Sequence, residues 1–331
     1  MNDGELGRER AVNEEAAMKM LGAEYESINS NKANFDRIYR MPDPREYFRV
    51  LYDLDYVIPE LSKTIFRSLI ANCRIRRRKR PKVLDIGCSY GVNAALVRFP
   101  LDIERLAARY GTPEMLTLSP SRLAELDRNY FESWPQLVDA DFVGVDCSYP
   151  AVAYAQDVGL IDAGVTSDLE RQSPQEAETE TLRGLDLIIS TGCVGYITEK
   201  SFARILALQD RGRMPWIASF VLRMFPYHSL AEELRKFGLV TEKLEGVTFV
   251  QRRFHSKLEC ETTIETLKAQ GIDPAGKETE GLYHAEFYLS RPESDIECLP
   301  LSDVISITSG ASRIYGSRYR QLKNDVVTLI P

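Results

Sequence analysis

The sequence predicts an α/β protein with a doubly wound, mostly parallel sheet of about seven strands. Buried apolar segments alternate with segments of helical spacing along most of the chain. One apolar segment, Lys82–Ile86, leads through a glycine turn into a helix that starts near Val92, as in the βα units of such sheets. Later, Val247–Phe254 and His284–Ser290 alternate with a period of two, which predicts an antiparallel terminal pair of strands.

Local signals give the order of the other elements. Ser119 and Pro120 predict a helix start, because serine caps a helix and proline suits its first position. Ser229 is predicted to cap a later amphipathic helix that ends before Gly238. The strands expected after the first one are 141–146, 163–166, 185–191 and 216–222.

The same order divides the chain into regions. The predicted regions are a polar, mobile N-terminus at 1–35, a helical cap at 36–80, an α/β domain at 81–291 and a C-terminal extension at 292–331. A minimal βαβ unit would place an acidic residue about 20 positions beyond the glycine turn. Asp146 lies much farther from Gly91 than that, so we expect a helical insertion at about 100–136.

Composition limits the class of protein. The 331 residues are 44% hydrophobic and 27% charged, as in ordinary globular chains. No apolar run of about 18 residues predicts a membrane span, and the polar N-terminus does not resemble a signal peptide. We therefore expect a cytoplasmic protein without a membrane partner. The six cysteines form no C-x-x-C pair, which argues against a zinc ribbon or a disulfide framework.

One segment departs from the acidic character of the chain. The net charge of -7 gives no overall attraction for nucleic acid, so such a partner is not expected. The segment Arg74–Lys82 is nevertheless strongly basic and could be a nucleic-acid patch or a localisation signal. It also follows a helical run, where cations oppose the helix dipole, so a solvated helix end is the competing interpretation.

The glycine turn carries the main functional signal, because such a turn directs backbone N–H groups at a ligand above the strand end. A dinucleotide fingerprint needs glycine at 87, 89 and 92, but the chain has Ser89 and Val92. The pattern present is Asp85-x-Gly87-x-Ser89-x-Gly91. It resembles the first motif of class I S-adenosylmethionine-dependent methyltransferases, an acidic residue followed by alternating glycines, with serine at the middle glycine. A turn that uses glycine only for packing is the alternative.

The resemblance implies S-adenosylmethionine as cofactor, S-adenosylhomocysteine as product and no metal ion. Asp146, followed by Cys147, stands after the second strand, where a carboxylate in this family accepts hydrogen bonds from both ribose hydroxyls. Asp168 and Leu169 stand after the third strand, where the family binds the adenine ring. The structural alternatives are a turn-starting or helix-capping role for Asp146 and a surface loop at Asp168.

The end of the fourth strand completes the implied cofactor site. Thr191 and Gly192 are expected to pass close to the methionine part of the cofactor, and ordinary strand termination is the alternative. The sequence after this strand lacks the motif of enzymes that methylate amino groups of adenine or glutamine. These features favour O- or N-methylation of a small-molecule acceptor.

Two residues are candidates for the acceptor pocket. His228 follows the fifth strand and is the predicted general base, because histidine titrates near neutral pH. Tyr196 lies just past the fourth strand and is the second candidate. A loop histidine and a packed loop aromatic are the respective alternatives.

Other functions stay open at this stage. The chain could be a nucleic-acid or protein methyltransferase that docks through Arg74–Lys82, a non-catalytic S-adenosylmethionine-binding protein, or a nicotinamide-dependent dehydrogenase. The tail Ile305–Leu329 could cover the site or pack against a second subunit, so a homodimer is one candidate assembly.

Overall fold

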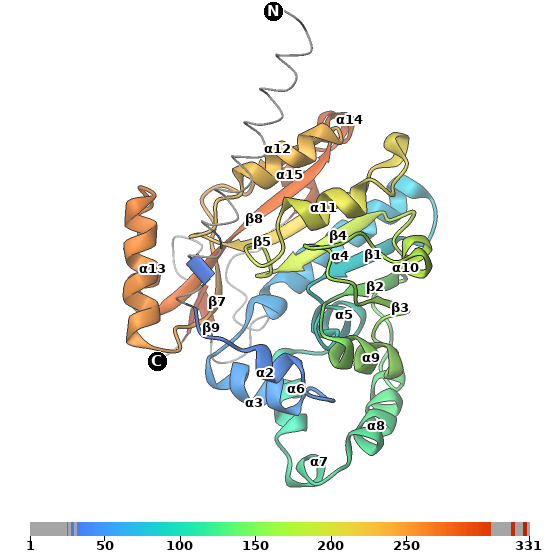
Figure 1. Cartoon of the computed structure of the whole chain (residues 1–331), viewed down its shortest axis with the longest axis vertical. Helices are drawn as coiled ribbons and strands as arrows, with labels where there is room; N and C mark the ends of the chain where they lie inside the picture. Colours follow the sequence, from blue (N-terminus) through green and yellow to red (C-terminus); the bar gives the residue numbers. More distant parts are fainter. Residues whose placement is uncertain (1–24, 26–27, 30–31, 306–318, 322–326, 330–331) are drawn as a thin grey trace, which may run out of the picture.

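The computed structural model describes residues 25, 28, 29, 32–305, 319–321 and 327–329 (Figure 1). Its main sheet runs in the order β3-β2-β1-β4-β5-β8-β6, and β7 also pairs with β8. The strands of this sheet are β1 (Lys82–Ile86), β2 (Asp141–Val145), β3 (Ala163–Val165), β4 (Leu187–Thr191), β5 (Trp216–Leu222), β6 (Leu239–Lys243), β7 (Phe249–Arg253) and β8 (Leu282–Pro292). A small separate sheet pairs β9 (Tyr319–Gln321) with β10 (Val327–Leu329).

The strand directions confirm the predicted fold class. β1 pairs in parallel with β2 on one side and with β4 on the other, and β8 runs antiparallel to β5, β6 and β7. β6 and β7 follow one another along the same edge of β8. The sequence predicted the β7–β8 pair but missed β6, because only the first residue of Leu239–Lys243 is buried and the segment shows no apolar alternation.

Helices cover both faces of the sheet. Phe66 of α4 packs with side chains of α5 and α9 on one face, whereas Phe202 of α11 and Leu234 of α12 pack on the other. The helices that precede β2 are α2 (Asp36–Tyr39), α3 (Arg45–Asp53), α4 (Ile58–Arg77), α5 (Val92–Arg98), α6 (Ile103–Tyr110), α7 (Pro113–Leu116) and α8 (Pro120–Glu132). The later helices are α9 (Tyr149–Asp157), α10 (Glu176–Thr181), α11 (Glu199–Leu206), α12 (His228–Lys236), α13 (Lys257–Ala269), α14 (Glu293–Cys298) and α15 (Leu301–Val304).

The helices around the first βα unit follow the local sequence signals. The segment predicted as an insertion contains α6, α7 and α8, and the Ser119 hydroxyl caps α8 by accepting a hydrogen bond from the Arg122 backbone N–H. These helices and α3 share an aromatic-rich core with α5 and α9, which includes Tyr47 and Tyr110. α4 contacts β4, β5 and β7, so it belongs to the layer that covers the sheet.

The cap predicted for α12 was wrong. The helix begins one residue before Ser229, at His228, with Tyr227 in the N-cap position and no side-chain capping bond. The Tyr227 carbonyl already accepts a hydrogen bond from the Ala231 N–H, because the preceding turn delivers the backbone in helical geometry. In the described part of the chain, no helix combines the length and the apolar character needed to cross a membrane.

Candidate cofactor site

The glycine turn between β1 and α5 bends sharply at alternate positions. Gly87, Ser89 and Gly91 have positive φ angles of 74°, 48° and 75°. A Cβ atom at Gly87 would lie 2.8 Å from the Cβ atom of Cys193, so the loop after β4 approaches the turn too closely for any side chain there. Ser89 adopts the left-handed conformation that costs an L-residue about 1–2 kcal/mol, which explains why glycine suits this position in the motif.

Asp146 connects the end of β2 to this turn. One carboxylate oxygen accepts a hydrogen bond from the Ser89 backbone N–H at 3.0 Å, and the other accepts one from the Ser148 N–H at 2.9 Å. A carboxylate offers about four lone-pair sites, so both oxygens can still accept bonds from a vicinal diol. Burial raises the pKa of Asp146, and the two backbone donors oppose that rise.

The position of Asp146 also decides between its structural alternatives. Its bond to the Ser148 N–H does start the next turn, as one alternative held. It does not cap the helix, because α9 has Ser148 in the N-cap position and no side-chain capping bond. Cys147 is exposed beside the carboxylate.

Asp168 and Leu169 lie just past the end of β3, the strand that pairs with β2. Asp168 is partly exposed, and it accepts a hydrogen bond from the Glu170 N–H at 3.1 Å and pairs with Arg171 at 3.4 Å. The Leu169 side chain is buried, and its carbonyl accepts a hydrogen bond from the Arg204 guanidinium. The two predicted acidic residues therefore stand at neighbouring strand ends.

Asp85 is fully buried at the centre of the site. The Asn93 side-chain amide donates to one Asp85 oxygen at 2.9 Å and also to the Thr191 hydroxyl at 3.0 Å. The other Asp85 oxygen is buried and has no hydrogen-bond partner among the described residues. Burial raises the pKa of Asp85 to about 7. An unpartnered buried carboxylate oxygen is costly, so this position suits a ligand that brings a cationic or hydrogen-bond donor group.

The side chain of Gln251 approaches the end of β4, and the sequence did not predict this contact. Gly192 has φ of 72°, and a Cβ atom there would lie 2.0 Å from the Gln251 amide nitrogen. Gln251 occupies a bulge of β7, where the pairing with β8 shifts between Val250 and Arg252. Bulges often redirect a side chain beside a functional site. No sequence signal marks this bulge, because nothing in the period-two pattern identifies the extra residue.

The two residues predicted for the acceptor pocket have different environments in the structure. Tyr196 is 52% exposed, and the Lys32 ammonium lies 4.4 Å from the centre of its ring. His228 is exposed at the start of α12, and it shares a hydrogen bond with the neighbouring Ser229 hydroxyl at 3.3 Å. In the described part of the chain, no hydrogen bond, ion pair or ring contact links His228 to another predicted site residue.

Two tyrosines absent from the prediction, Tyr39 and Tyr56, interact with residues of the site. Burial is the main cause of the raised pKa of Tyr39, and electrostatic interactions with Tyr56 and Asp146 raise it further. The pKa of Tyr56 is raised mainly by burial and is opposed by its hydrogen bond to Thr191. Aromatic residues are dense in the segment before β1, and this density was a sequence signal. The sequence did not show which of these side chains reach the strand ends.

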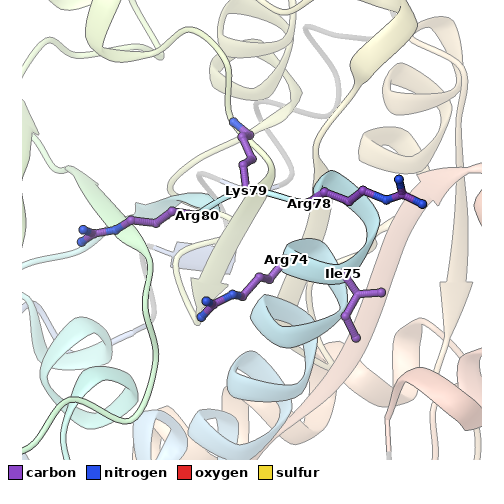
Figure 2. A pocket seen from close by; sticks show the side chains of 5 residues that line it. All are labelled: Arg74, Ile75, Arg78, Lys79 and Arg80. Atoms are coloured by element: carbon purple, nitrogen blue, oxygen red, sulfur yellow. The ribbon is translucent and has the colours of Figure 1, made fainter.

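The basic segment lies at the opposite edge of the sheet. It ends α4 and precedes β1 on the amino side, and the four steps of β1 extend about 13 Å to the glycine turn. Its ion pairs are Arg74–Asp139 at 3.4 Å, Arg76–Asp295 at 2.6 Å, Arg77–Asp186 at 3.2 Å, Lys79–Asp186 at 3.0 Å and Arg80–Asp141 at 3.0 Å. Figure 2 shows a surface groove here whose basic side chains point in different directions: Arg74, Arg78, Lys79 and Arg80.

Among the described residues, no group of three or more His, Cys, Asp or Glu side chains could hold a metal ion. The described chain brings three carboxylates together at or just past the carboxyl ends of neighbouring strands: Asp85 on β1, Asp146 after β2 and Asp168 after β3.

Comparisons with known proteins give structural neighbours only. No protein-family model and no curated protein matches the chain. A solved structure of the plantazolicin methyltransferase BpumL with SAH is 13% identical, with 84% of this chain and 99% of that chain covered and a TM-score of 0.39. A TehB-like SAM-dependent methyltransferase from Corynebacterium glutamicum is 16% identical, with 66% and 86% covered and a TM-score of 0.31. The magnesium protoporphyrin IX methyltransferase from Synechocystis is 14% identical, with 70% and 80% covered and a TM-score of 0.32.

Proposed function

We propose that the chain is an S-adenosylmethionine-dependent methyltransferase that methylates an oxygen or nitrogen atom of a small-molecule acceptor. The observation that carries the proposal is the hydrogen bond from the Ser89 N–H to Asp146. It joins the glycine turn and the carboxylate proposed to bind ribose into one unit. The unpartnered oxygen of Asp85 lies one strand away, where β1 pairs with β2.

The residues present fit the parts of this cofactor. Asp146 would accept the ribose hydroxyls, and Asp168 with the Leu169 N–H would face the adenine. Asp85 and the backbone around Gly192 would face the methionine amino group, because the buried Asp85 oxygen needs a donor. The close approach of Cys193 to Gly87 excludes a side chain at Gly87.

The sulfonium of the bound cofactor would supply an activated methyl group, so the chain itself must mainly orient the acceptor and exclude water. We assign Tyr196, Tyr39 and Gln251 to the lining of the acceptor side. His228 remains a predicted base, but its exposed position gives the role no support. All six cysteines are free thiols, which supports the cytoplasmic location that is part of this proposal.

Calorimetry on the full chain tests the cofactor. We expect S-adenosylhomocysteine and S-adenosylmethionine to bind and NADH to give no heat of binding. Binding of NADH alone would overturn the proposal in favour of a dehydrogenase. The turnover test is formation of S-adenosylhomocysteine in the presence of small hydroxyl- or amine-bearing acceptors. Cofactor binding without turnover on any acceptor would instead favour the non-catalytic binding protein.

The geometry disfavours docking of a nucleic acid through the basic segment. Most of its cations are paired with carboxylates, and it lies on the edge of the sheet away from Asp146. A polymer bound there would have to extend around the sheet to present a base or side chain to the glycine turn. Replacing Arg78 and Arg80 with glutamine should therefore leave S-adenosylhomocysteine binding and small-molecule methylation unchanged.

A further inference from the structure

A segment near the N-terminus crosses the loops that follow β4 and β5. We call its described residues the strap: Tyr25, Ile28, Asn29 and 32–35. The Tyr25 hydroxyl donates to the Pro226 carbonyl at 2.6 Å, and the Asn29 amide donates to the Gly195 carbonyl at 2.7 Å. The strap is thus attached to both loops at the carboxyl edge of the sheet.

Lys32 extends from the strap between two aromatic rings. Its ammonium lies 4.4 Å from the ring centre of Tyr196 and 5.2 Å from that of Phe225. Aromatic faces attract a cation, but they do not neutralise its charge. Among the described residues, no carboxylate lies within ion-pair distance of this ammonium.

The carboxylate of Glu259, which raises the pKa of Lys32, already has other partners. Glu259 on α13 forms a two-point pair with Arg252, at 2.7 Å and 3.0 Å. It also accepts hydrogen bonds from the backbone N–H groups of Ala33 and His255. Glu259 thus offsets Arg252, and the ammonium of Lys32 is left as an excess positive charge.

The environment of Lys32 makes that charge costly. Burial, followed by repulsion from Arg252, lowers the pKa of Lys32 to about 7, whereas Glu259 and Cys193 oppose the change. A charged group held in this way gains most from a ligand of opposite charge.

The position of Lys32 relates it to the proposed active site. Cys193 is close enough to affect its pKa, and Cys193 packs directly on Gly87 of the glycine turn. Tyr196, whose ring the ammonium covers, belongs to the same loop after β4. Lys32 therefore lies close to the loop after β4, and this loop packs on the glycine turn.

We propose that Lys32 determines acceptor specificity by binding an anionic group of the acceptor, a carboxylate or a similar oxyanion, while the apolar body of the acceptor lies against the exposed ring of Tyr196. The inference rests on the proposed function, because it places the acceptor beside the cofactor. A second strap group supports it. The Asn29 side-chain oxygen is buried without a hydrogen-bond partner among the described residues, so it can accept a bond from a hydroxyl or amino group of the same acceptor.

Benzoate is a suitable probe, since it combines an aromatic ring with a carboxylate. We would titrate it by calorimetry into the full chain saturated with S-adenosylhomocysteine, at about pH 6, where Lys32 is protonated. Benzyl alcohol and benzylamine serve as neutral and cationic counterparts. We expect benzoate to bind, and both counterparts to bind at least about tenfold more weakly.

Variants then assign the effect to one side chain. Lys32→Met should weaken benzoate binding by about tenfold or more, and Lys32→Arg should keep it within a few-fold of the parent. Lys257→Met, a change at an exposed lysine of α13, is the matched control and should have no effect. Raising the pH through about 7 should weaken benzoate binding to the parent protein, because Lys32 loses its proton.

The outcomes of these experiments distinguish a failure of the role of Lys32 from a failure of the proposed function on which that role rests. Failure of S-adenosylhomocysteine to bind would overturn the proposed function. If that product binds but benzoate does not, or if Lys32→Met binds benzoate as well as the parent, the role of Lys32 is wrong and the proposed function stands.

Discussion

Replacing Asp146 with alanine is the most direct perturbation of the proposed site. In the structure its carboxylate accepts backbone hydrogen bonds from Ser89 and Ser148 and lies at the end of β2. If both oxygens also accept bonds from ribose hydroxyls, alanine removes a charged acceptor from two ligand donors. Hydrogen bonds to charged groups contribute about 1.5–3 kcal/mol each, and some of this is recovered by water in the variant.

We therefore expect Asp146→Ala to weaken S-adenosylhomocysteine binding by about 1.5–3 kcal/mol, which is roughly a 10- to 150-fold rise in the dissociation constant. Part of the loss will come from the turn, because Ser89 loses the acceptor that holds its N–H. Asp146→Asn keeps one oxygen acceptor without the charge, so its loss should lie between those of alanine and the parent protein.

Calorimetric titration with S-adenosylhomocysteine measures the effect, and thermal unfolding of each variant establishes that it is folded. Asp141→Ala is the matched control, since Asp141 begins the same strand and pairs with the exposed Arg80 at the other edge of the sheet. Its affinity should equal that of the parent. A folded Asp146→Ala variant that binds within about twofold of the parent would refute the ribose role.

Further predictions concern the turn and its buried acid. Gly87→Ala should cut S-adenosylhomocysteine affinity by about tenfold or more in a titration, because the new Cβ would lie 2.8 Å from the Cβ of Cys193. The control is Gly184→Ala, where φ is also positive but the space is open, and it should cost only about 1 kcal/mol of stability. Ser89→Gly should stabilise the chain by roughly 1 kcal/mol in urea unfolding without weakening cofactor binding. Glycine adopts the positive φ angle of this position without strain, and the substitution removes a buried hydroxyl that has no hydrogen-bond partner in the described chain. Asp85 binds its proton more tightly when folded, so its contribution to stability is present at low pH and is lost as the pH rises from 3.8 to about 7. Asp85→Asn should remove this pH-dependent loss of stability. In urea unfolding without cofactor, the stability of the variant relative to the parent should rise by roughly 2–3 kcal/mol between about pH 5 and pH 8. An equal pH dependence in both proteins would contradict this assignment.

The sequence was informative where structure is local. β1, the glycine turn and the start of α5 occupy one continuous segment, so their apolar run and glycine spacing can be interpreted without knowing what lies nearby. Asp146 was identified because it ends a buried strand, and the ends of neighbouring parallel strands meet at one edge of a sheet. The roles assigned to these residues toward a cofactor remain predictions.

The acceptor side was harder to predict, because sequence position does not give side-chain direction. His228 was placed correctly after β5, yet it is exposed at the start of α12. Gln251 reaches Gly192 only because β7 carries a bulge, and a bulge changes which face a side chain occupies. Lys32 lies in a polar segment whose sequence has no periodic pattern, and its neighbours Tyr196 and Phe225 are far away along the chain.

The contact of Asp146 with the glycine turn and the contacts of the strap have different consequences for specificity. The carboxylate of Asp146 is joined to the turn across 57 residues, within consecutive elements of the sheet. The strap is joined to the acceptor side across 166 residues at Asn29–Gly195 and 226 residues at Ala33–Glu259. Substitutions in the strap can therefore alter the groups that meet an acceptor without changing the strand ends proposed to hold the cofactor. If the proposed roles hold, changes at Lys32 should weaken acceptor binding and leave S-adenosylhomocysteine affinity unchanged. Changes at Asp146 should weaken S-adenosylhomocysteine binding and leave acceptor binding unchanged, when each ligand is titrated alone.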